Sequence, residues 1–194
     1  MEKRLYFRTK YYKWLPIRFL IERILEKMTR ETVDFLSHFI KEREKIIDIG
    51  AGAGWISHEL QRRKRTDNTL LDVINLNQTD LPLIIYDGKN IPFEDNSFDV
   101  ALLICVLHHC QYPLEVLKEA KRVVKDRIII IEDISSSFLG GIALRLKDAI
   151  ANIGFCLMAN SLREITNLPF RFKKTSEWEE IFENLHLKVI YKRE

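Results

Sequence analysis

Residues 46–54 read Ile-Ile-Asp-Ile-Gly-Ala-Gly-Ala-Gly, a short apolar segment that runs into three glycines at alternate positions. The apolar residues predict a β-strand, and the glycines that follow (residues 50–54, the glycine loop) allow a tight turn and the close approach of a ligand. A turn from a strand into a helix leaves backbone N–H groups exposed at the positive end of the helix dipole. The segment therefore predicts a site for a nucleotide-like ligand, and a glycine-rich turn without a ligand is the alternative.

The spacing of the glycines distinguishes between classes of ligand. A dinucleotide fingerprint has the form Gly-x-Gly-x-x-Gly; Gly50 and Gly52 fit it, but Trp55 occupies the place of its third glycine. The third glycine comes one residue early, at Gly54, and Asp48 precedes the first glycine. A carboxylate there repels a pyrophosphate and attracts a cationic ligand. These two departures argue against a nicotinamide-dependent dehydrogenase.

Three segments of the chain resemble one enzyme family. The pattern Asp-x-Gly-x-Gly-x-Gly resembles motif I of the class I S-adenosylmethionine-dependent methyltransferases, whose cofactor carries an ammonium and a sulfonium and no phosphate. Residues 86–100, Tyr-Asp-Gly-Lys-Asn-Ile-Pro-Phe-Glu-Asp-Asn-Ser-Phe-Asp-Val, are similar to a segment of the methyltransferase type 11 group. Residues 104–109, Ile-Cys-Val-Leu-His-His, resemble the end of the fourth strand in that group. The resemblance covers about residues 46–133.

The resemblance implies a binding site for S-adenosylmethionine and its product S-adenosylhomocysteine. The carboxylate of Asp72 can accept hydrogen bonds from both ribose hydroxyls. The alternative interpretation of Asp72 is an exposed carboxylate in a turn. In the family, the residue at the place of Asp87 accepts from the adenine amino group, the N–H at Gly88 donates to the ring, and the carbonyl at Cys105 accepts from the ammonium. We expect Cys105 itself to be a small buried residue. The full set of candidate cofactor-binding residues is Asp48, Gly50, Ala51, Gly52, Gly54, Asp72, Val73, Asp87, Gly88 and Cys105.

His108 and His109 are the candidate catalytic residues. Histidine titrates near neutrality and can take a proton from an incoming hydroxyl or amine. The alternative is a structural histidine that bridges the loop, since a sulfonium is already a strong leaving group and placement alone supplies much of the catalysis. The cysteines show no Cys-x-x-Cys spacing, so no metal site is predicted.

Strand and helix patterns alternate along the chain, which predicts a parallel sheet with right-handed crossovers. The predicted strands are 46–49, 70–74, 83–86, 100–106, 128–131 and 187–191. The predicted helices are 17–41 with a break near Thr29, 56–65, 113–124, one or two within 138–159, and one capped by Ser176 with Glu179 in a capping box. The segment between the second and third strands is too short for a full helix. The predicted fold is α/β, a three-layer Rossmann-like methyltransferase fold with helices on both faces of a mostly parallel sheet and incomplete final antiparallel strands.

The chain of 194 residues predicts a single methyltransferase domain. Its predicted parts are an N-terminal helical cap (1–41), a cofactor-binding core (46–133) and a helical insertion on the substrate side (135–175). Three cysteines without paired spacing favour a reducing compartment, and we expect a cytoplasmic location. No apolar run reaches the roughly 20 residues that span a bilayer.

Basic residues concentrate in the N-terminal segment. Residues 1–30 hold nine Lys and Arg and three Glu, whereas the whole chain has a net charge of +3. Mixed with aromatic side chains, this segment predicts an amphipathic cap helix, and the alternatives are a surface for single-stranded nucleic acid or for a membrane. The resemblance to the methyltransferase type 11 group implies an enzyme that transfers a methyl group, which we expect to go to a small-molecule nucleophile by in-line displacement. The alternatives are an RNA or protein acceptor and a non-catalytic S-adenosylmethionine-binding module, and the oligomeric state is not predicted.

Overall fold

The structure is a computed structural model that describes residues 18–134 and 171–193. The helices in these ranges are α1 (Arg18–Leu36), α2 (Trp55–Lys64), α3 (Pro113–Val123) and α5 (Thr175–Asn184), with a short 3-10 helix η1 (Leu107–His109). The strands are β1 (Lys45–Ile49), β2 (Asp67–Asp72), β3 (Leu83–Ile85), β4 (Phe98–Ile104) and β5 (Val124–Ile131). The helices predicted within 138–159 and most of the predicted insertion lie outside the described residues, as does most of the basic segment.

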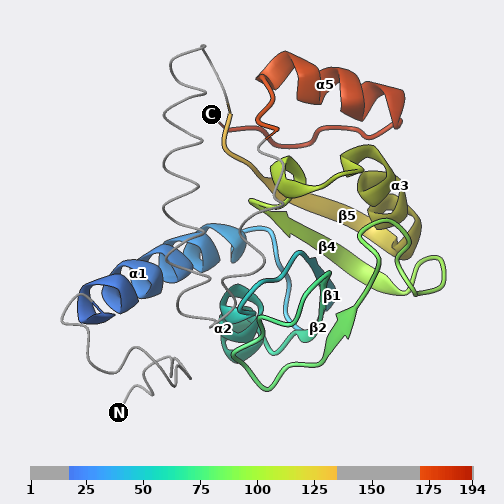
Figure 1. The fold of residues 1–194 in the computed structure, drawn as a ribbon. Coiled ribbons are helices and arrows are strands. Elements are labelled where there is room, and N and C mark those ends of the chain that lie inside the picture. The colour runs from blue at the N-terminus through green and yellow to red at the C-terminus, as the bar shows by residue number, and fades with distance from the viewer. Residues whose placement is uncertain (1–17, 135–170, 194) are drawn as a thin grey trace.

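The strands form one parallel sheet in the order β3-β2-β1-β4-β5, which Figure 1 shows at the centre of the molecule. The order reverses between β1 and β4, where Asp48 lies beside Leu102. Ligands bind at the carboxyl ends of the strands near such a reversal. The predicted parallel sheet is confirmed. Several boundaries differ from the prediction: β2 runs from Asp67 to Asp72, β4 ends at Ile104, and β5 begins at Val124 and not at residue 128.

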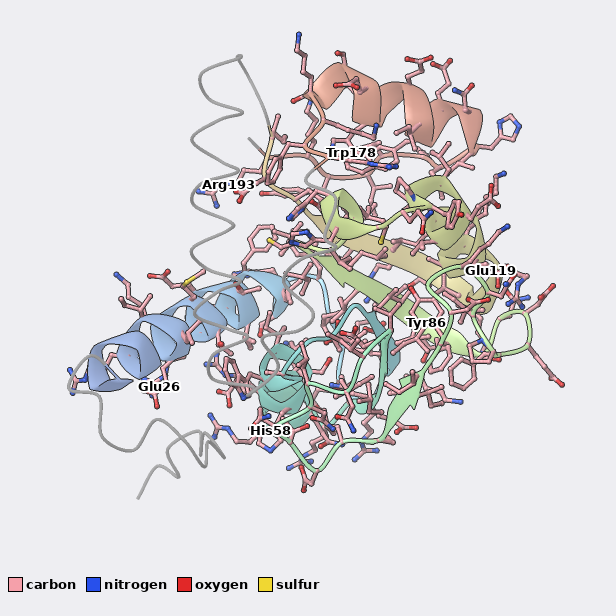
Figure 2. The ribbon with its side chains drawn as sticks, in the orientation of Figure 1. Glu26, His58, Tyr86, Glu119, Trp178 and Arg193 are labelled. Atoms are coloured by element: carbon pink, nitrogen blue, oxygen red, sulfur yellow. The ribbon has the colours of Figure 1, made fainter. Side chains whose placement is uncertain are left out.

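Two apolar clusters cover the two faces of the sheet. Because successive strand residues point to opposite faces, Ile46 and Val100 pack with α1 and α2, whereas Ile47 and Ala101 pack with α3 and α5. Figure 1 shows the same division, with α1 and α2 on one side of the strands and α3 and α5 on the other. Trp178 of α5 is buried and points toward the sheet in Figure 2. The predicted three-layer arrangement is confirmed.

Predictions about the boundaries of α1 and α5 are wrong. Helix α1 ends at Leu36 and not at residue 41. Helix α1 continues without a break through Thr29, whose side chain is buried and packs as part of the inner face of the helix. Helix α5 begins before Ser176, because the backbone N–H of Lys174 donates to the carboxylate of Glu177 at 2.8 Å. Glu177 rather than Glu179 therefore completes the capping box.

The predicted strand at 187–191 does not form. Residues 187–193 have no strand pairing, and Ile190 is 76% exposed. This tail (residues 187–193) instead places the ring of Tyr191 against Phe35 and Phe39. The apolar residues of this segment are suited to a strand, but a sequence pattern does not supply the neighbouring strand that pairing requires.

One connection agrees with the sequence analysis, whereas the connection predicted between the helix at 113–124 and the strand at 128–131 does not form. Residues 73–82 between β2 and β3 contain no helix, as predicted from the shortness of that segment. Helix α3 passes directly into β5 at Val123 and Val124, without an intervening loop. Among the described helices, none is long and apolar enough to cross a bilayer.

Candidate active site

The glycine loop links the end of β1 to the start of α2. Gly50, Gly52 and Gly54 have φ angles of +73°, +54° and +76°, the left-handed region in which side chains are disfavoured. A Cβ added at Gly50 would lie 2.1 Å from Cγ2 of Val106, and one at Gly54 would lie 2.6 Å from Cδ1 of Leu70. The loop therefore packs tightly between the end of β4 and strand β2. The early third glycine is required by this packing.

Asp72, the last residue of β2, holds the glycine loop in place. Its Oδ2 accepts the backbone N–H of Gly52 at 2.8 Å, and its Oδ1 accepts that of Val73 at 2.7 Å. The side chain is 8% exposed, and burial raises the pKa of the carboxyl group above its usual range. Asp72 is thus a buried residue of the site and not an exposed turn carboxylate. A carboxylate oxygen has two lone pairs, so Oδ2 keeps one for a ligand hydroxyl.

Asp48 lies in β1 directly below the glycine loop and is 4% exposed. Its Oδ2 accepts the hydroxyl of Ser57, in the first turn of α2, at 2.6 Å. The pKa of Asp48 is raised to about 6, mainly by burial; the Ser57 hydrogen bond opposes this rise, and the nearby Asp72 contributes a smaller rise. Two buried carboxylates on adjacent strands therefore give this part of the molecule an unbalanced negative potential when both are ionised.

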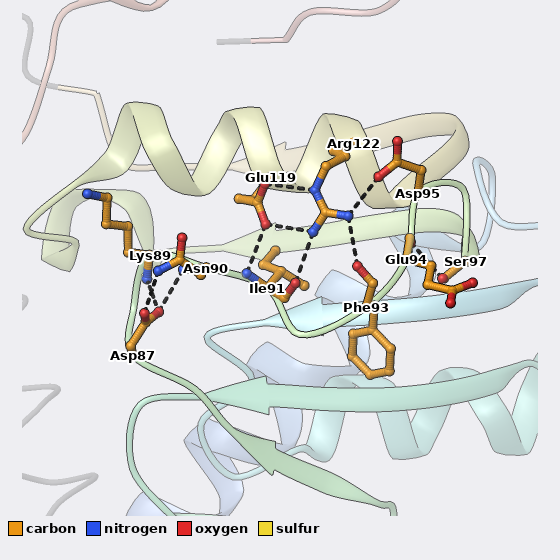
Figure 3. A network of polar contacts seen from close by, with 10 residues as sticks. All are labelled: Asp87, Lys89, Asn90, Ile91, Phe93, Glu94, Asp95, Ser97, Glu119 and Arg122. Carbon is orange, nitrogen blue, oxygen red and sulfur yellow. Dashed lines mark hydrogen bonds and ion pairs between the residues drawn. The ribbon is translucent and has the colours of Figure 1, made fainter.

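The chain after β3 forms a compact turn around Asp87 (Figure 3). Oδ1 of Asp87 accepts the backbone N–H groups of Lys89 and Asn90 at 2.8 and 2.6 Å, and its Oδ2 accepts the side-chain amide of Asn90. These hydrogen bonds hold the pKa of Asp87 below its usual range. Gly88 has a φ of +76°, and a Cβ there would lie 3.1 Å from Cγ1 of Val73. The structure thus brings two more of the predicted residues, from the ends of β2 and β3, into contact.

Arg122 on α3 fixes the segment that follows this turn, as Figure 3 shows. Its guanidinium donates to the carbonyl oxygens of Ile91 and Phe93 at 2.9 and 2.8 Å and to the carboxylate of Asp95 at 2.8 Å. Glu119 accepts from Arg122 at 2.7 Å and from the N–H of Ile91 at 3.0 Å. The sequence analysis assigned no role to this network. Its only signal was the Glu-x-x-Arg spacing on α3, which is common on exposed helices.

Cys105 follows β4 at a sharp turn of the backbone. Its φ is +51°, its N–H donates to the carbonyl of Ile131 at 2.7 Å, and its side chain is exposed. The expectation of a small buried residue is wrong, because the left-handed conformation ends the in-and-out alternation of the strand. The role of its carbonyl toward a ligand stays a prediction.

The two histidines lie in different environments. His108 is 1% exposed, its Nδ1 lies 2.5 Å from Oε2 of Glu132, and its ring stacks on Phe172 with centroids 4.6 Å apart. His109 is half-buried, with its ring centroid 4.0 Å from that of His108. These contacts favour the structural alternative for His108, whose ring has little access to an acceptor. A catalytic role for either histidine stays a prediction.

Glu132 is the residue of this site that the sequence analysis missed. It follows β5 directly, and its side chain is 4% exposed. Its Oε1 accepts the backbone N–H groups of Val106 and Leu107 at 2.9 and 2.7 Å, while Oε2 contacts His108. The available signal was an acidic residue immediately after an apolar strand, at the same edge of the sheet as Asp72. The described residues contain no group of His, Cys, Asp or Glu arranged to hold a metal ion.

Comparison with known proteins identifies the core of the chain. Residues 47–131 match the family model described as "Methyltransferase domain". This range runs from within β1 to the end of β5 and includes the glycine loop, Asp72 and Asp87. The core belongs to the class I S-adenosylmethionine-dependent methyltransferases. The resemblance seen in the sequence is thereby confirmed for this methyltransferase domain.

Relatives of the methyltransferase domain are found among both sequences and structures. A demethylmenaquinone methyltransferase of Corynebacterium kroppenstedtii is 32% identical over 109 residues, which cover 54% of this chain and 45% of that protein. The chain spans about half the length of the curated relatives that it matches.

Two solved structures share the fold. A SAM-dependent methyltransferase from Thermotoga maritima superposes with a TM-score of 0.62 at 18% identity, over 89% of this chain and 79% of that chain. A SAM-dependent methyltransferase from Aquifex aeolicus gives a TM-score of 0.55 at 19% identity, over 91% and 86%. At these identities the likeness establishes the fold of the methyltransferase domain.

Proposed function

We propose that this chain binds S-adenosylmethionine and transfers its methyl group to a small molecule. One observation carries the proposal: the three predicted cofactor-binding carboxylates at the carboxyl edge of the sheet have uncharged partners. Asp48, Asp72 and Asp87 are bonded to hydroxyl, backbone N–H and amide groups. None of the three forms an ion pair with a Lys or Arg among residues 18–134 and 171–193. Such an edge favours a cationic ligand over a phosphate.

The residues of this edge fit the chemistry of the cofactor. Asp72 keeps an acceptor position for a ribose hydroxyl, and Oδ2 of Asp87, which accepts one hydrogen bond, keeps one for the adenine amino group. Ionised Asp48 supplies negative potential below the glycine loop, which favours an ammonium and a sulfonium. When bound, the cofactor supplies a methyl group activated by the positive charge on sulfur.

The residues of this chain contribute mainly by placing the reactants. Displacement at a methyl carbon needs the acceptor atom in line with the breaking bond, and such placement supplies at most about 7–11 kcal/mol of barrier reduction. His109, half-buried after β4, is the candidate to take a proton from a hydroxyl or amine acceptor. Buried His108, stacked on Phe172 and held by Glu132, fixes the loop that carries His109.

A small-molecule acceptor is supported by relatives that are named demethylmenaquinone methyltransferases. RNA and protein acceptors are the competing outcomes. Transfer of a labelled methyl group into fractionated cell extract distinguishes them, since the label would enter the low-molecular-mass fraction in the first case and a macromolecular fraction in the others.

Calorimetry tests cofactor binding directly. We expect the chain to bind S-adenosylmethionine and S-adenosylhomocysteine, and Asp72→Asn to weaken binding by about tenfold, because an amide accepts fewer hydrogen bonds and carries no charge. Asp99→Asn is the matched control, since Asp99 lies at the amino end of β4 and its Oδ2 accepts the backbone N–H of Lys45 at 2.9 Å. Binding of neither ligand by a folded chain would refute the proposed function. Binding without transfer into any fraction would favour the non-catalytic module.

A further inference from the structure

We infer that Glu132 is the positioning residue of this site, and that it sets the direction of the Cys105 carbonyl and the place of the glycine loop. The inference rests on the proposed function, because its principal readout is cofactor binding. It concerns a residue that follows β5, outside the glycine loop and outside the segments that resemble the family's binding motifs.

The Glu132 carboxylate holds three consecutive residues of another segment. Its two oxygens receive the backbone N–H of Val106 at 2.9 Å, the backbone N–H of Leu107 at 2.7 Å and the ring nitrogen Nδ1 of His108 at 2.5 Å. The side chain is 4% exposed, so water competes little for these bonds. Hydrogen bonds to an ionised acceptor are the stronger kind. The start of η1 is therefore held mainly by the Glu132 carboxylate and not by hydrogen bonds within this three-residue helix.

The peptide group between Cys105 and Val106 carries this constraint to the ligand side. A trans peptide is planar, with its C=O and N–H pointing in opposite directions, and the described chain has no cis peptide. Since the Val106 N–H points at Glu132, the Cys105 carbonyl points away from it. The N–H of Cys105 is bonded to Ile131 at 2.7 Å, so the backbone is held on both sides of that carbonyl.

The side chain of Val106 carries the same constraint to the glycine loop. Its Cγ2 would lie 2.1 Å from a Cβ at Gly50, so Val106 packs directly on the Gly50 backbone. Movement of Val106 away from Glu132 therefore opens a gap beside Gly50 or moves the loop. Interiors pack too closely to absorb such a shift without cost.

Glu44 provides a matched control at the other end of the sheet. It too is a buried carboxylate, accepting the backbone N–H of Lys41 at 2.8 Å and the guanidinium of Arg127 at 2.7 Å. It directly precedes β1, so it lies at the amino end of the sheet. Loss of Glu44 removes comparable contacts without touching the carboxyl edge.

The experiment compares Glu132→Ala, Glu132→Gln and Glu44→Ala by calorimetry with S-adenosylhomocysteine, at a temperature where circular dichroism shows each to be folded. Glu132→Ala is expected to weaken binding by about tenfold or more, as the loss of charge-assisted hydrogen bonds implies. Glu132→Gln keeps a carbonyl oxygen for both backbone N–H groups and is expected to bind within about threefold of the native chain. Glu44→Ala is expected to melt earlier and to bind normally.

Amide hydrogen exchange provides a readout that does not depend on the ligand. Glu132→Ala is expected to speed exchange at Val106 and Leu107, while Glu44→Ala leaves it unchanged there. If Glu132→Ala does not fold, Glu132→Asp replaces it, because the shorter Asp side chain moves the carboxylate away from the backbone N–H groups of Val106 and Leu107. Gln has the same length as Glu and still reaches them. Native binding by folded Glu132→Ala, or equal weakening by Glu44→Ala, would overturn the inference. Failure of the native chain to bind would overturn the proposed function, whereas unchanged exchange at Val106 would overturn the positioning role itself.

Discussion

The two ends of the parallel sheet hold buried carboxylates in different ways. At the amino end, Glu44 forms an ion pair with Arg127 at 2.7 Å. At the carboxyl end, Asp48 accepts only the hydroxyl of Ser57, and Asp72 accepts only backbone N–H groups, among the contacts that the described chain makes. Charge is neutralised within the chain at one end and left for a ligand at the other. We therefore propose that the buried carboxylate at the amino end contributes to stability and that those at the carboxyl end bind the ligand.

The largest expected effect is that of Gly50→Ala, which breaks the carboxyl end alone. The left-handed φ costs roughly 1–2 kcal/mol for a residue with a Cβ, and the contact with Val106 adds roughly 1–3 kcal/mol of overpacking. We expect cofactor binding to be lost in calorimetry and the chain to unfold at lower denaturant concentration. The double variant with Val106→Ala should recover part of the stability, and no recovery would mean that backbone strain alone is responsible.

Arg127→Ala tests the amino end of the sheet, where we expect a loss of stability without a loss of ligand binding. It leaves buried Glu44 without its ionic partner and also removes hydrogen bonds to the carbonyl of Phe39. Breaking a buried pair in this way costs roughly 3–4 kcal/mol. We expect this loss in denaturant unfolding, with normal binding of S-adenosylhomocysteine at a temperature where the variant is folded. Adding Glu44→Gln should reduce the loss, since no uncompensated charge then remains.

Asp48→Asn sharpens the comparison through pH. The folded pKa of Asp48, about 6, lies above the usual 3.8, so the folded state binds the proton more tightly than the unfolded state. The contribution of Asp48 to the free energy of unfolding therefore falls as pH rises from about 4 to about 6. Two pKa units correspond to about 3 kcal/mol.

The amide side chain of the Asp48→Asn variant cannot ionise, so the free energy of unfolding of this variant should lack this fall. The difference in stability between variant and native chain should therefore shift in favour of the variant as the pH rises from 4 to 7. Native binding of a cationic ligand should strengthen between pH 5 and pH 7, while that of Asp48→Asn should not. The measurements are urea unfolding and calorimetry across that range. Parallel pH profiles for the two proteins would contradict a charged role for Asp48.

The smallest expected effect is that of Asp87→Asn, because Asp87 is exposed and its turn also contains Asn90. An amide oxygen can replace Oδ1 toward the backbone N–H groups, so the turn should persist. We expect an affinity loss of about threefold for S-adenosylhomocysteine and an unchanged melting temperature. A loss as large as that of Asp72→Asn would mean that the adenine side contributes as much as the buried carboxylates.

The fold was predictable where the signal is local and apolar. The uninterrupted apolar runs at 100–106 and 128–131 predicted strands of a parallel sheet, because such runs are typical of strands that are covered on both faces. The start of α5 was not predictable to the residue, since Lys174, Thr175 and Ser176 are all acceptable N-terminal positions and Glu177 selects one. The strand at 187–191 failed because pairing depends on a neighbour that the pattern does not contain.

The site divides in the same way. The glycine loop was predictable because its three glycines follow the strand directly in the sequence. Asp72 was predictable because it is an acidic residue at the end of the next strand. Glu132 was not, because its partners are the backbone of a segment more than twenty residues earlier in the chain. The burial of His108 was equally hidden, since it depends on Glu132 and on Phe172.

The tail after α5 has a consequence for how the molecule opens. It starts in the layer formed by α3 and α5 and ends with Tyr191 against Phe35 and Phe39, with ring centroids 6.1 and 4.8 Å apart. Phe35 packs on the opposite face of the sheet. The tail therefore ties together the two outer layers that the sheet separates, so that one layer cannot detach without loosening the other. Local opening should be suppressed in favour of a single cooperative transition, with similar exchange protection in α1 and α5.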